Sequence, residues 1–291
     1  MDITASMVKD LREKTGAGMM DCKKALVETN GDMDKAIDYL REKGITKAAK
    51  KADRIAAEGL SNIYIDGNNA VVIEVNSETD FVAKNAEFKE LIDKIGNAIL
   101  ASEAGSMEEA LEIKVENDTV NDLIVNATAK IGEKISLRRF EKVTKNDNEV
   151  FGSYLHMGGK ISSLIVIKGG SEEVAKDVAM QAAAMRPLYM TVESVPAEDL
   201  EHEKSVIKEQ VINEGKKLEF ADKIIEGRIS KFYEEVVLTN QKFIKDSSLT
   251  ISNYLNNNNA KLVKMIKYEV GEGMEKRNDD FAAEVMSQIK G

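Results

Sequence analysis

Two strand pairs, each closed by a turn and each followed by a helical pattern, constrain most strongly what this chain can fold into. The first pair comprises residues 60–65 and 70–75. Residues 66–69 between them, Asp-Gly-Asn-Asn, are typical of a turn that closes an antiparallel hairpin. A helical pattern follows over residues 83–100. This segment is therefore predicted to be a β-hairpin followed by a helix.

The same order of elements returns later in the chain. Residues 150–156 and 161–167 make a second strand pair around a turn at 157–160, and a helix is predicted over residues 172–185. A repeated order of elements is the usual sign of duplicated supersecondary units. The chain is therefore predicted to contain two similar α+β subdomains.

A helical module is predicted at the start of the chain. Residues 4–43 show three short helical patterns, with Asp32 as a plausible cap of the third. Gly44 is expected to end that helix, because glycine is common just after a helical C-terminus. Residues 45–58 are rich in Lys and Ala and are predicted to be a tether or a linking helix.

The remaining segments alternate between helix and strand. Residues 117–131 are predicted to be a helix that Gly132 ends, and a strand follows at 134–143. Residues 197–232 are predicted to form a helical hairpin. Each of its helices has one apolar stripe, which the body of the protein or another chain must cover. A last strand is predicted at 261–270.

Together these elements predict an α+β fold with a two-part core of antiparallel hairpins and helices. The predicted segments are a three-helix module with its linker at 1–55, a first core subdomain at 56–148, a second core subdomain at 149–186 and 233–268, an inserted helical hairpin at 187–232, and a C-terminal segment with one helix at 269–291.

Composition excludes several classes of protein. The net charge of −10 argues against general nucleic-acid binding, which needs a dominant basic surface. The basic stretch at 43–54 is interpreted as a solvated helix face or a linker. Cys22 is the only cysteine, which fits a reducing compartment. With no signal peptide and no apolar run near the roughly 18 residues of a membrane span, a soluble cytoplasmic protein is expected.

The sequence lacks the residues that common enzymatic motifs require. A phosphate-binding loop would need a glycine at Tyr154 and a Ser or Thr at Ile161. One Cys and two His exclude the usual zinc sites, and Cys22 is better explained by packing than as a nucleophile. No spacing among the 51 acidic residues singles out an acid–base pair. The chain is therefore expected to use no cofactor or metal and not to be an enzyme.

The tetrapeptide Thr79-Asp80-Phe81-Val82 is the strongest candidate site. It lies between a predicted strand and a predicted helix, a position from which a rigid scaffold can present a carboxylate and a phenyl ring to a partner. The competing interpretation makes Thr79 or Asp80 a helix cap, with Phe81 packed back on the core. From the residues alone both interpretations stay open.

The second predicted helix offers another candidate contact. At 100° per residue, Cys22, Ala25 and Leu26 cluster on one side, and Met20 points almost directly away from them. Met19 lies at the edge of that face. Together with Lys23, these methionines form a candidate contact patch, although a single exposed methionine is ordinary.

The residues at 11–26 and 74–82 closely resemble bacterial elongation factor Ts. Further matches to this family lie at 130–133, 152–154, 226–228, 270–273 and 280–285. The resemblance covers the whole chain, and its first two motifs are highly specific. It implies an N-terminal module similar to ubiquitin-associated domains, a two-part core, a helical hairpin that resembles a dimerisation element, and a C-terminal module.

The resemblance also implies a function and a partner. It implies a guanine-nucleotide exchange factor that binds elongation factor Tu carrying GDP, with neither nucleic acid nor a membrane as a direct partner, and with a homodimer through 187–232 as an option. Thr79, Asp80, Phe81 and Val82 would enter the GTPase domain near its magnesium site. The other implied contacts are Met19, Met20 and Lys23 in the N-terminal module, Ile131, Gly132 and His156 in the core, and Val285 and Met286 in the C-terminal module.

Two rival functions remain alongside this one. An adaptor or chaperone of a GTPase would bind its partner without accelerating GDP release. An enzyme would use Asp80 or Glu78 as an acid or base and would need a ligand pocket at that turn.

Overall fold

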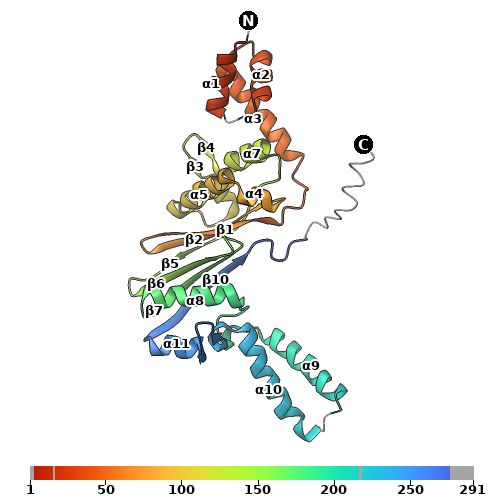
Figure 1. Ribbon diagram of the computed structural model, residues 1–291, viewed down its shortest axis with the longest axis vertical. Helices are drawn as coiled ribbons and strands as arrows, with labels where there is room; N and C mark the ends of the chain where they lie inside the picture. Colours follow the sequence, from red (N-terminus) through yellow and green to blue (C-terminus); the bar gives the residue numbers. More distant parts are fainter. Residues whose placement is uncertain (1–2, 16, 216–217, 276–291) are drawn as a thin grey trace. The chain divides into compact units, whose positions relative to one another are not determined.

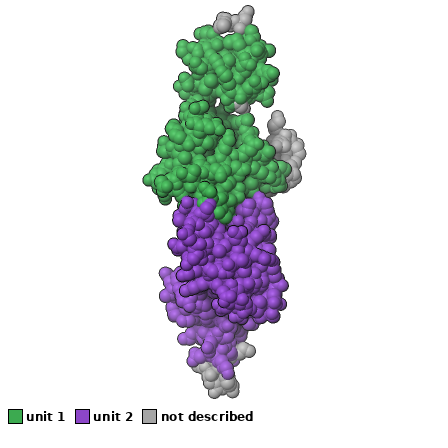
Figure 2. Space-filling model, turned by 90° about the vertical axis from the view of Figure 1, so that its left-hand side faces the viewer, with its two compact units in different colours: residues 1–66, 70–142, 269–291 green, residues 67–69, 143–268 purple. Residues whose placement is uncertain are grey.

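The computed structural model describes residues 3–15, 17–215 and 218–275, which divide into two compact units (Figures 1 and 2). Unit 1 comprises residues 1–66, 70–142 and 269–291, and unit 2 comprises residues 67–69 and 143–268. Antiparallel sheets and helices occur in both units, so the predicted α+β fold is confirmed.

Unit 1 begins with the three predicted helices, α1 (Ala5–Thr15), α2 (Met19–Glu28) and α3 (Met33–Ala49). Asp32 caps α3, because its side chain accepts a hydrogen bond from the Lys35 backbone N–H at 3.1 Å. The helices enclose a small apolar core of Val8, Leu11, Cys22, Ala25, Leu26 and Ala36. The apolar spacing of the sequence thus identified this module correctly.

The prediction that Gly44 ends the third helix is wrong. The helix α3 runs on to Ala49, and Gly44 is buried inside it. Gly44 lies against α7 (Val120–Ile131), where a Cβ would stand 3.7 Å from the Cβ of Ala129. The small residue therefore marks a close approach of two helices rather than a helix end.

Gly44→Ala is expected to raise the free energy of unfolding by about 0.5–1 kcal/mol, the difference between glycine and alanine inside a helix. The added methyl group would make only ordinary van der Waals contact with α7. Urea unfolding followed by circular dichroism measures the change. A lower unfolding midpoint for the alanine variant would contradict this account of the α3–α7 contact.

The α+β part of unit 1 is built on a three-stranded sheet. Its strands β1 (Glu58–Asp66), β2 (Asn69–Ser77) and β5 (Ser136–Thr144) lie in the order β1-β2-β5. The predicted first hairpin and the strand at 134–143 are thereby confirmed. The helix predicted at 83–100 is two helices, α4 (Asp80–Lys84) and α5 (Ala86–Ala101), because Asn85 has an extended backbone and caps α5.

Apolar side chains of α5 and α7 pack with those of β2 into the main core of unit 1. Phe88, Ile92, Ile95 and Ile99 of α5 occupy one helical face and are at most 2% exposed. The short elements between α5 and α7 were not predicted from the sequence, and they are α6 (Met107–Leu111), β3 (Lys114–Val115) and β4 (Asp118–Thr119).

Unit 2 repeats the sheet-plus-helix arrangement. Strands β6 (Glu149–His156), β7 (Ile161–Gly169) and β10 (Ala260–Glu269) lie in the order β10-β7-β6. The second hairpin is antiparallel, and its register pairs His156 with Ile161. The helix α8 (Glu172–Met185) has the predicted bounds. Its approach to β6 needs Gly152, where a Cβ would lie 2.0 Å from the carbonyl carbon of Ala175.

The predicted helical hairpin is present in unit 2 as α9 (Ala197–Asn213) and α10 (Leu218–Val236). Its helices bury Ile207, Val211 and Ile229 against each other. Dimerisation through this hairpin stays a prediction. Elements not predicted in unit 2 are η1 (Val192–Ser194), η2 (Leu238–Asn240), β8 (Lys242–Phe243), β9 (Asp246–Thr250) and α11 (Ile251–Asn257).

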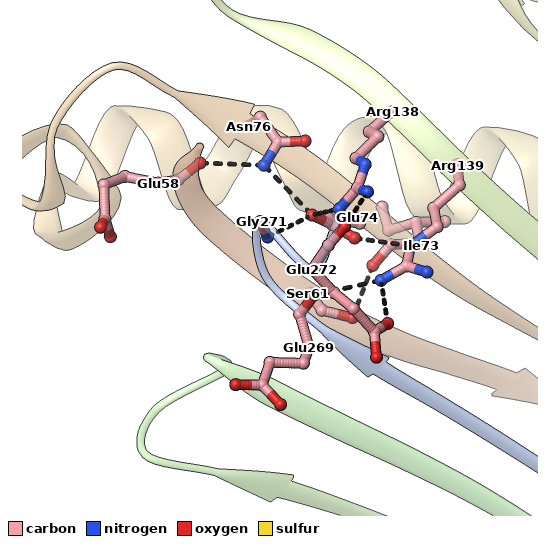
Figure 3. A network of polar contacts seen from close by, with 10 residues as sticks. All are labelled: Glu58, Ser61, Ile73, Glu74, Asn76, Arg138, Arg139, Glu269, Gly271 and Glu272. Atoms are coloured by element: carbon pink, nitrogen blue, oxygen red, sulfur yellow. Dashed lines mark hydrogen bonds and ion pairs between the residues drawn. The ribbon is translucent and has the colours of Figure 1, made fainter. Parts of the chain in front are cut away.

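A buried carboxylate ties three segments of unit 1 together (Figure 3). Glu74 lies on the central strand β2 and is fully buried. Its Oε1 accepts hydrogen bonds from Arg138 Nη1 at 2.9 Å and from the Gly271 backbone N–H at 2.9 Å. Its Oε2 accepts one from Arg139 Nε at 2.6 Å. A charge inside an apolar core is tolerated only with such partners.

The two arginines extend this network to the last residue of β10 and to the segment that follows it. Arg139 Nη2 donates to the Glu269 carbonyl at 3.1 Å and to Glu272 Oε2 at 3.2 Å. Arg138 Nη2 donates to the Glu272 carbonyl. The chain that leaves β10 is therefore held on the sheet of unit 1 by charge-assisted hydrogen bonds, which are stronger than neutral ones.

Candidate partner-binding site

The predicted corner at Thr79–Val82 is the turn between β2 and α4. Thr79 has an extended backbone, with φ −126° and ψ 158°, and caps α4. Its Oγ1 accepts a hydrogen bond from the Val82 backbone N–H at 3.5 Å. A threonine at this position satisfies one of the N–H groups that a helix start leaves unpaired. The corner is thus a defined strand-to-helix turn.

Phe81 points away from the core of unit 1. Its side chain is 79% exposed, while the next two residues, Val82 and Ala83, are 8% and 3% exposed and belong to the main core. The alternative in which Phe81 packs back on the core is therefore wrong. Successive helical residues are about 100° apart, so Val82 and Ala83 occupy the core side of α4 and Phe81 is left outside.

Charged side chains flank the exposed ring. Asp80 Oδ2 accepts from Lys84 Nζ at 2.6 Å, one helical turn away, and Lys84 Nζ lies 5.8 Å from the centroid of the Phe81 ring. A cation at this distance from a ring is weakly attracted to its face. The corner therefore presents a carboxylate, an ammonium group and a phenyl ring together.

Two glutamates clasp this corner to the turn between α7 and β5. Glu133 accepts hydrogen bonds from the Thr79 backbone N–H at 3.0 Å and from Thr79 Oγ1 at 2.6 Å. In the opposite direction, Glu78 Oε1 accepts from the Lys134 backbone N–H at 2.6 Å. We call the pair Glu78 and Glu133, with these three hydrogen bonds, the glutamate clasp.

The clasp brings two groups of predicted residues together. Ile131 is the last residue of α7, and Gly132 follows it with a left-handed backbone at φ 87°. Glu133 comes next and holds Thr79, so Ile131 and Gly132 lie beside the corner that carries Phe81. Glycine is suited to Gly132's position, because a side chain rarely adopts positive φ.

The linker after α3 reaches the same place. Arg54 Nη1 lies 3.3 Å from Glu78 Oε1, and Lys134 Nζ donates to the Arg54 carbonyl at 3.0 Å. The basic stretch at 43–54 was interpreted as a solvated helix face or a linker. It is helical up to Ala49, and at Arg54 it is tied to the clasp.

The methionine patch lies on α2, as predicted. Met19 is 58% exposed and Met20 is 74% exposed, while Cys22 is fully buried on the opposite face. Lys23 is exposed beside them. Burial raises the pKa of the Cys22 thiol, which fits a packing role for this cysteine.

His156 lies at the end of β6 in unit 2 and is partly exposed. Its ring centroid is 6.1 Å from that of Tyr154. Its neighbours Leu155 and Met157 are 42% and 68% exposed. These apolar neighbours were not among the contacts predicted from the sequence.

Val285 and Met286, with the rest of the predicted C-terminal helix, lie outside the described residues. The remaining predicted contacts occupy separate elements: α2, the β2–α4 corner with the end of α7, and the β6–β7 turn. Sequence reasoning missed the structural roles of Glu74, Glu78 and Glu133, and it named Glu78 only as an acid or base of a rival enzyme. A signal existed for Glu74, because a single charge inside the apolar run at 71–75 indicates a buried, paired carboxylate.

A cavity of about 580 Å³ lies elsewhere in unit 1, between the helical module and the helices α5 and α7. Ion pairs such as Lys47 with Asp21 and Lys130 with Glu87 involve residues that line it. Thr79, Asp80 and Phe81 are not among its lining residues. This cavity is therefore not the ligand pocket that an enzyme acting through the corner would need.

The described residues contain neither a helix able to cross a membrane nor a cluster of metal-ligating side chains. No helix there combines the length and the apolar composition that crossing a membrane requires. No three His, Cys, Asp or Glu side chains there are grouped so that they could hold a metal ion.

Comparisons with a family model and with individual proteins point to the same family. The family model of Elongation factor TS matches residues 78–272 of this chain. Two proteins named Elongation factor Ts, from Limosilactobacillus reuteri strain DSM 20016 and from Limosilactobacillus reuteri subsp. reuteri strain JCM 1112, are each 54% identical to it over 288 residues. The alignment covers 99% of this chain and 99% of each relative.

Proposed function

The chain belongs to the elongation factor Ts family of translation elongation factors, and from this premise we propose that it is a guanine-nucleotide exchange factor for elongation factor Tu. The observation that carries the proposal is the exposed ring of Phe81 on a corner whose backbone the glutamate clasp holds. A fully exposed aromatic ring on a rigid corner is the kind of side chain that anchors a protein–protein contact.

The proposed mechanism makes and breaks no covalent bond in this chain. A magnesium ion that bridges nucleotide phosphates to a GTPase demands near-ideal octahedral geometry. A ring that enters an apolar pocket near this ion displaces an element of its coordination shell, and Asp80 competes for polar groups close by. The affinity of the partner for the ion and its affinity for GDP then fall together. The protein is accordingly proposed to act without enzymatic chemistry or a cofactor of its own.

The magnitudes are compatible with this mechanism. A thousandfold faster release of GDP corresponds to about 4 kcal/mol of activation free energy. Burial of one phenylalanine side chain supplies about 1.5–3 kcal/mol. Phe81 alone therefore does not suffice, and contacts from Met19 and Met20 would supply part of the remainder.

Reciprocity follows from the thermodynamics of two ligands on one partner. If this protein weakens the affinity of its partner for GDP, GDP must weaken the affinity of the partner for this protein by the same factor. The complex of all three is then short-lived, and incoming GTP ejects the factor. The proposed site of action is the cytoplasm, where translation takes place.

Release of a fluorescent GDP analogue from the cognate elongation factor Tu tests the proposal. We expect the chain to accelerate release by orders of magnitude, and to bind the nucleotide-free partner more tightly than the GDP-bound partner. Binding with unchanged release would favour an adaptor or chaperone of the GTPase. Equal affinity for the two forms of the partner would contradict the exchange mechanism.

A further inference from the structure

The helix that carries Phe81 has only five residues, Asp80–Lys84. A helix this short is not stable by itself in water, so its geometry depends on contacts from outside. Val82 and Ala83 attach its inner side to the core. At its start, the acceptor for the Val82 backbone N–H is Thr79 Oγ1. The position of the Phe81 ring therefore depends on how the Thr79 hydroxyl is oriented.

Glu133 sets this orientation. A hydroxyl group has one hydrogen to donate, and that of Thr79 goes to Glu133 Oε1 at 2.6 Å. The lone pairs of Oγ1 are then left to face the Val82 N–H. The second carboxylate oxygen, Oε2, holds the Thr79 backbone N–H at 3.0 Å. One carboxylate thus fixes both the backbone and the side chain of the capping residue.

Glu78 makes the connection in the opposite direction. Its Oε1 accepts from the Lys134 backbone N–H at 2.6 Å, and its side chain also meets Arg54 Nη1. Each turn therefore supplies a carboxylate that holds a backbone N–H of the other turn. Hydrogen bonds to ionised acceptors are about twice as strong as neutral ones, so neither turn moves without breaking strong contacts.

We infer that Glu133 and Glu78 are positioning residues that hold the Phe81 corner ready for insertion into the partner. The inference rests on the proposed exchange function and extends it to residues that need not touch the nucleotide site of the partner. A preordered corner avoids the entropic cost of fixing the ring during binding. Loss of the clasp should therefore slow exchange although the Phe81 side chain is still present.

The first test compares variants in the GDP-release assay. Glu133→Ala should reduce the acceleration about ten- to hundredfold, the loss expected when hydrogen bonds to a charged group are removed. Glu133→Gln should lie between this variant and the unchanged chain, because its amide keeps one acceptor oxygen. Glu112→Ala is the matched control, an exposed glutamate at the end of α6. An unchanged rate for Glu133→Ala would overturn the inference.

A double variant separates positioning from a direct contact. If Glu133 acts through the ring, Glu133→Ala should change the rate less than about twofold once Phe81→Ala is present. If the double variant instead lost the product of the two single reductions in GDP-release rate, Glu133 would act independently of Phe81. That result would overturn the positioning role. The expected result is strong non-additivity.

Hydrogen exchange of the Val82 amide in the free chain provides a readout that needs no partner. Glu133→Ala should make this amide exchange faster and leave the amides of β5 protected, which also shows that the variant is folded. An unchanged Val82 amide would overturn the inference even if the chain accelerates GDP release. A chain that fails to accelerate release would instead overturn the proposed function, and the Val82 result would still show whether the clasp orders the corner.

Discussion

Replacement of Glu74 by alanine is expected to lower the free energy of unfolding by about 3 kcal/mol. The change removes a fully buried carboxylate and leaves Arg138, Arg139 and the Gly271 N–H without their shared acceptor. Breaking a buried ion pair from one side costs about 3–5 kcal/mol. The lower end applies here, because the arginine side chains are 24% and 29% exposed and water can reach them.

Urea unfolding followed by circular dichroism measures this loss, and Glu272→Ala is its matched control. Glu272 pairs with the same Arg139 but is 43% exposed, so its removal should cost less than about 1 kcal/mol. Equal losses for the two variants would show that burial of Glu74 does not decide the strength of the network.

The pH dependence of the free energy of unfolding provides a second test of the role of Glu74. Burial by itself would raise the pKa of Glu74, but the Gly271 N–H and the two arginines outweigh it and lower the pKa below its ordinary value of 4.5. A carboxylate with a lowered pKa in the folded state stabilises the protein fully above its unfolded pKa. The stability difference between the unchanged chain and Glu74→Ala should therefore be constant near neutral pH and shrink as the pH falls below about 4.5. A difference that stays constant down to pH 3 would contradict the assignment.

Phe81→Ala is expected to slow the accelerated release of GDP about ten- to hundredfold, the equivalent of the 1.5–3 kcal/mol that burial of the ring supplies. The free energy of unfolding should change by less than about 0.5 kcal/mol, because the side chain is 79% exposed in the free protein. The two measurements together separate a contact with the partner from a general loss of structure.

Ile65→Ala is a suitable control for Phe81→Ala. Ile65 is a large apolar residue of the same unit, 43% exposed on β1, and is not among the proposed contacts. The control should leave GDP release unchanged. If Phe81→Ala also leaves it unchanged, the mechanism moves to Asp80 or to the Met19–Met20 patch, and Asp80→Ala then becomes the deciding variant.

Local signals predicted much of this fold correctly. The hairpins β1–β2 and β6–β7, the bounds of α8 and the end of α7 at Gly132 follow from turn chemistry and apolar period. These signals work because each depends on residues within a few positions of one another. The same reasoning placed Met20 opposite the buried Cys22 on α2.

Local signals failed where a distant segment determines the outcome. Gly44 has the residue type of a helix end, but α7 packs against it and α3 continues. For Phe81 the local signals left two interpretations open, and the burial of Val82 and Ala83 on the core side of α4 decides between them. At Gly44 a segment far away in the sequence therefore overrides the local preference.

The α+β class, the order of the main helices and strands, and membership of the elongation factor Ts family follow from the amino-acid sequence alone. The roles of the glutamates and the way in which the corner is held become visible only in the folded chain. Glu133 meets Thr79 across 54 positions, Glu78 meets Lys134 across 56, and Glu74 meets Gly271 across 197. Periodicity describes neighbours along the chain, whereas a buried or clasped carboxylate is selected by the donors that folding brings to it from elsewhere.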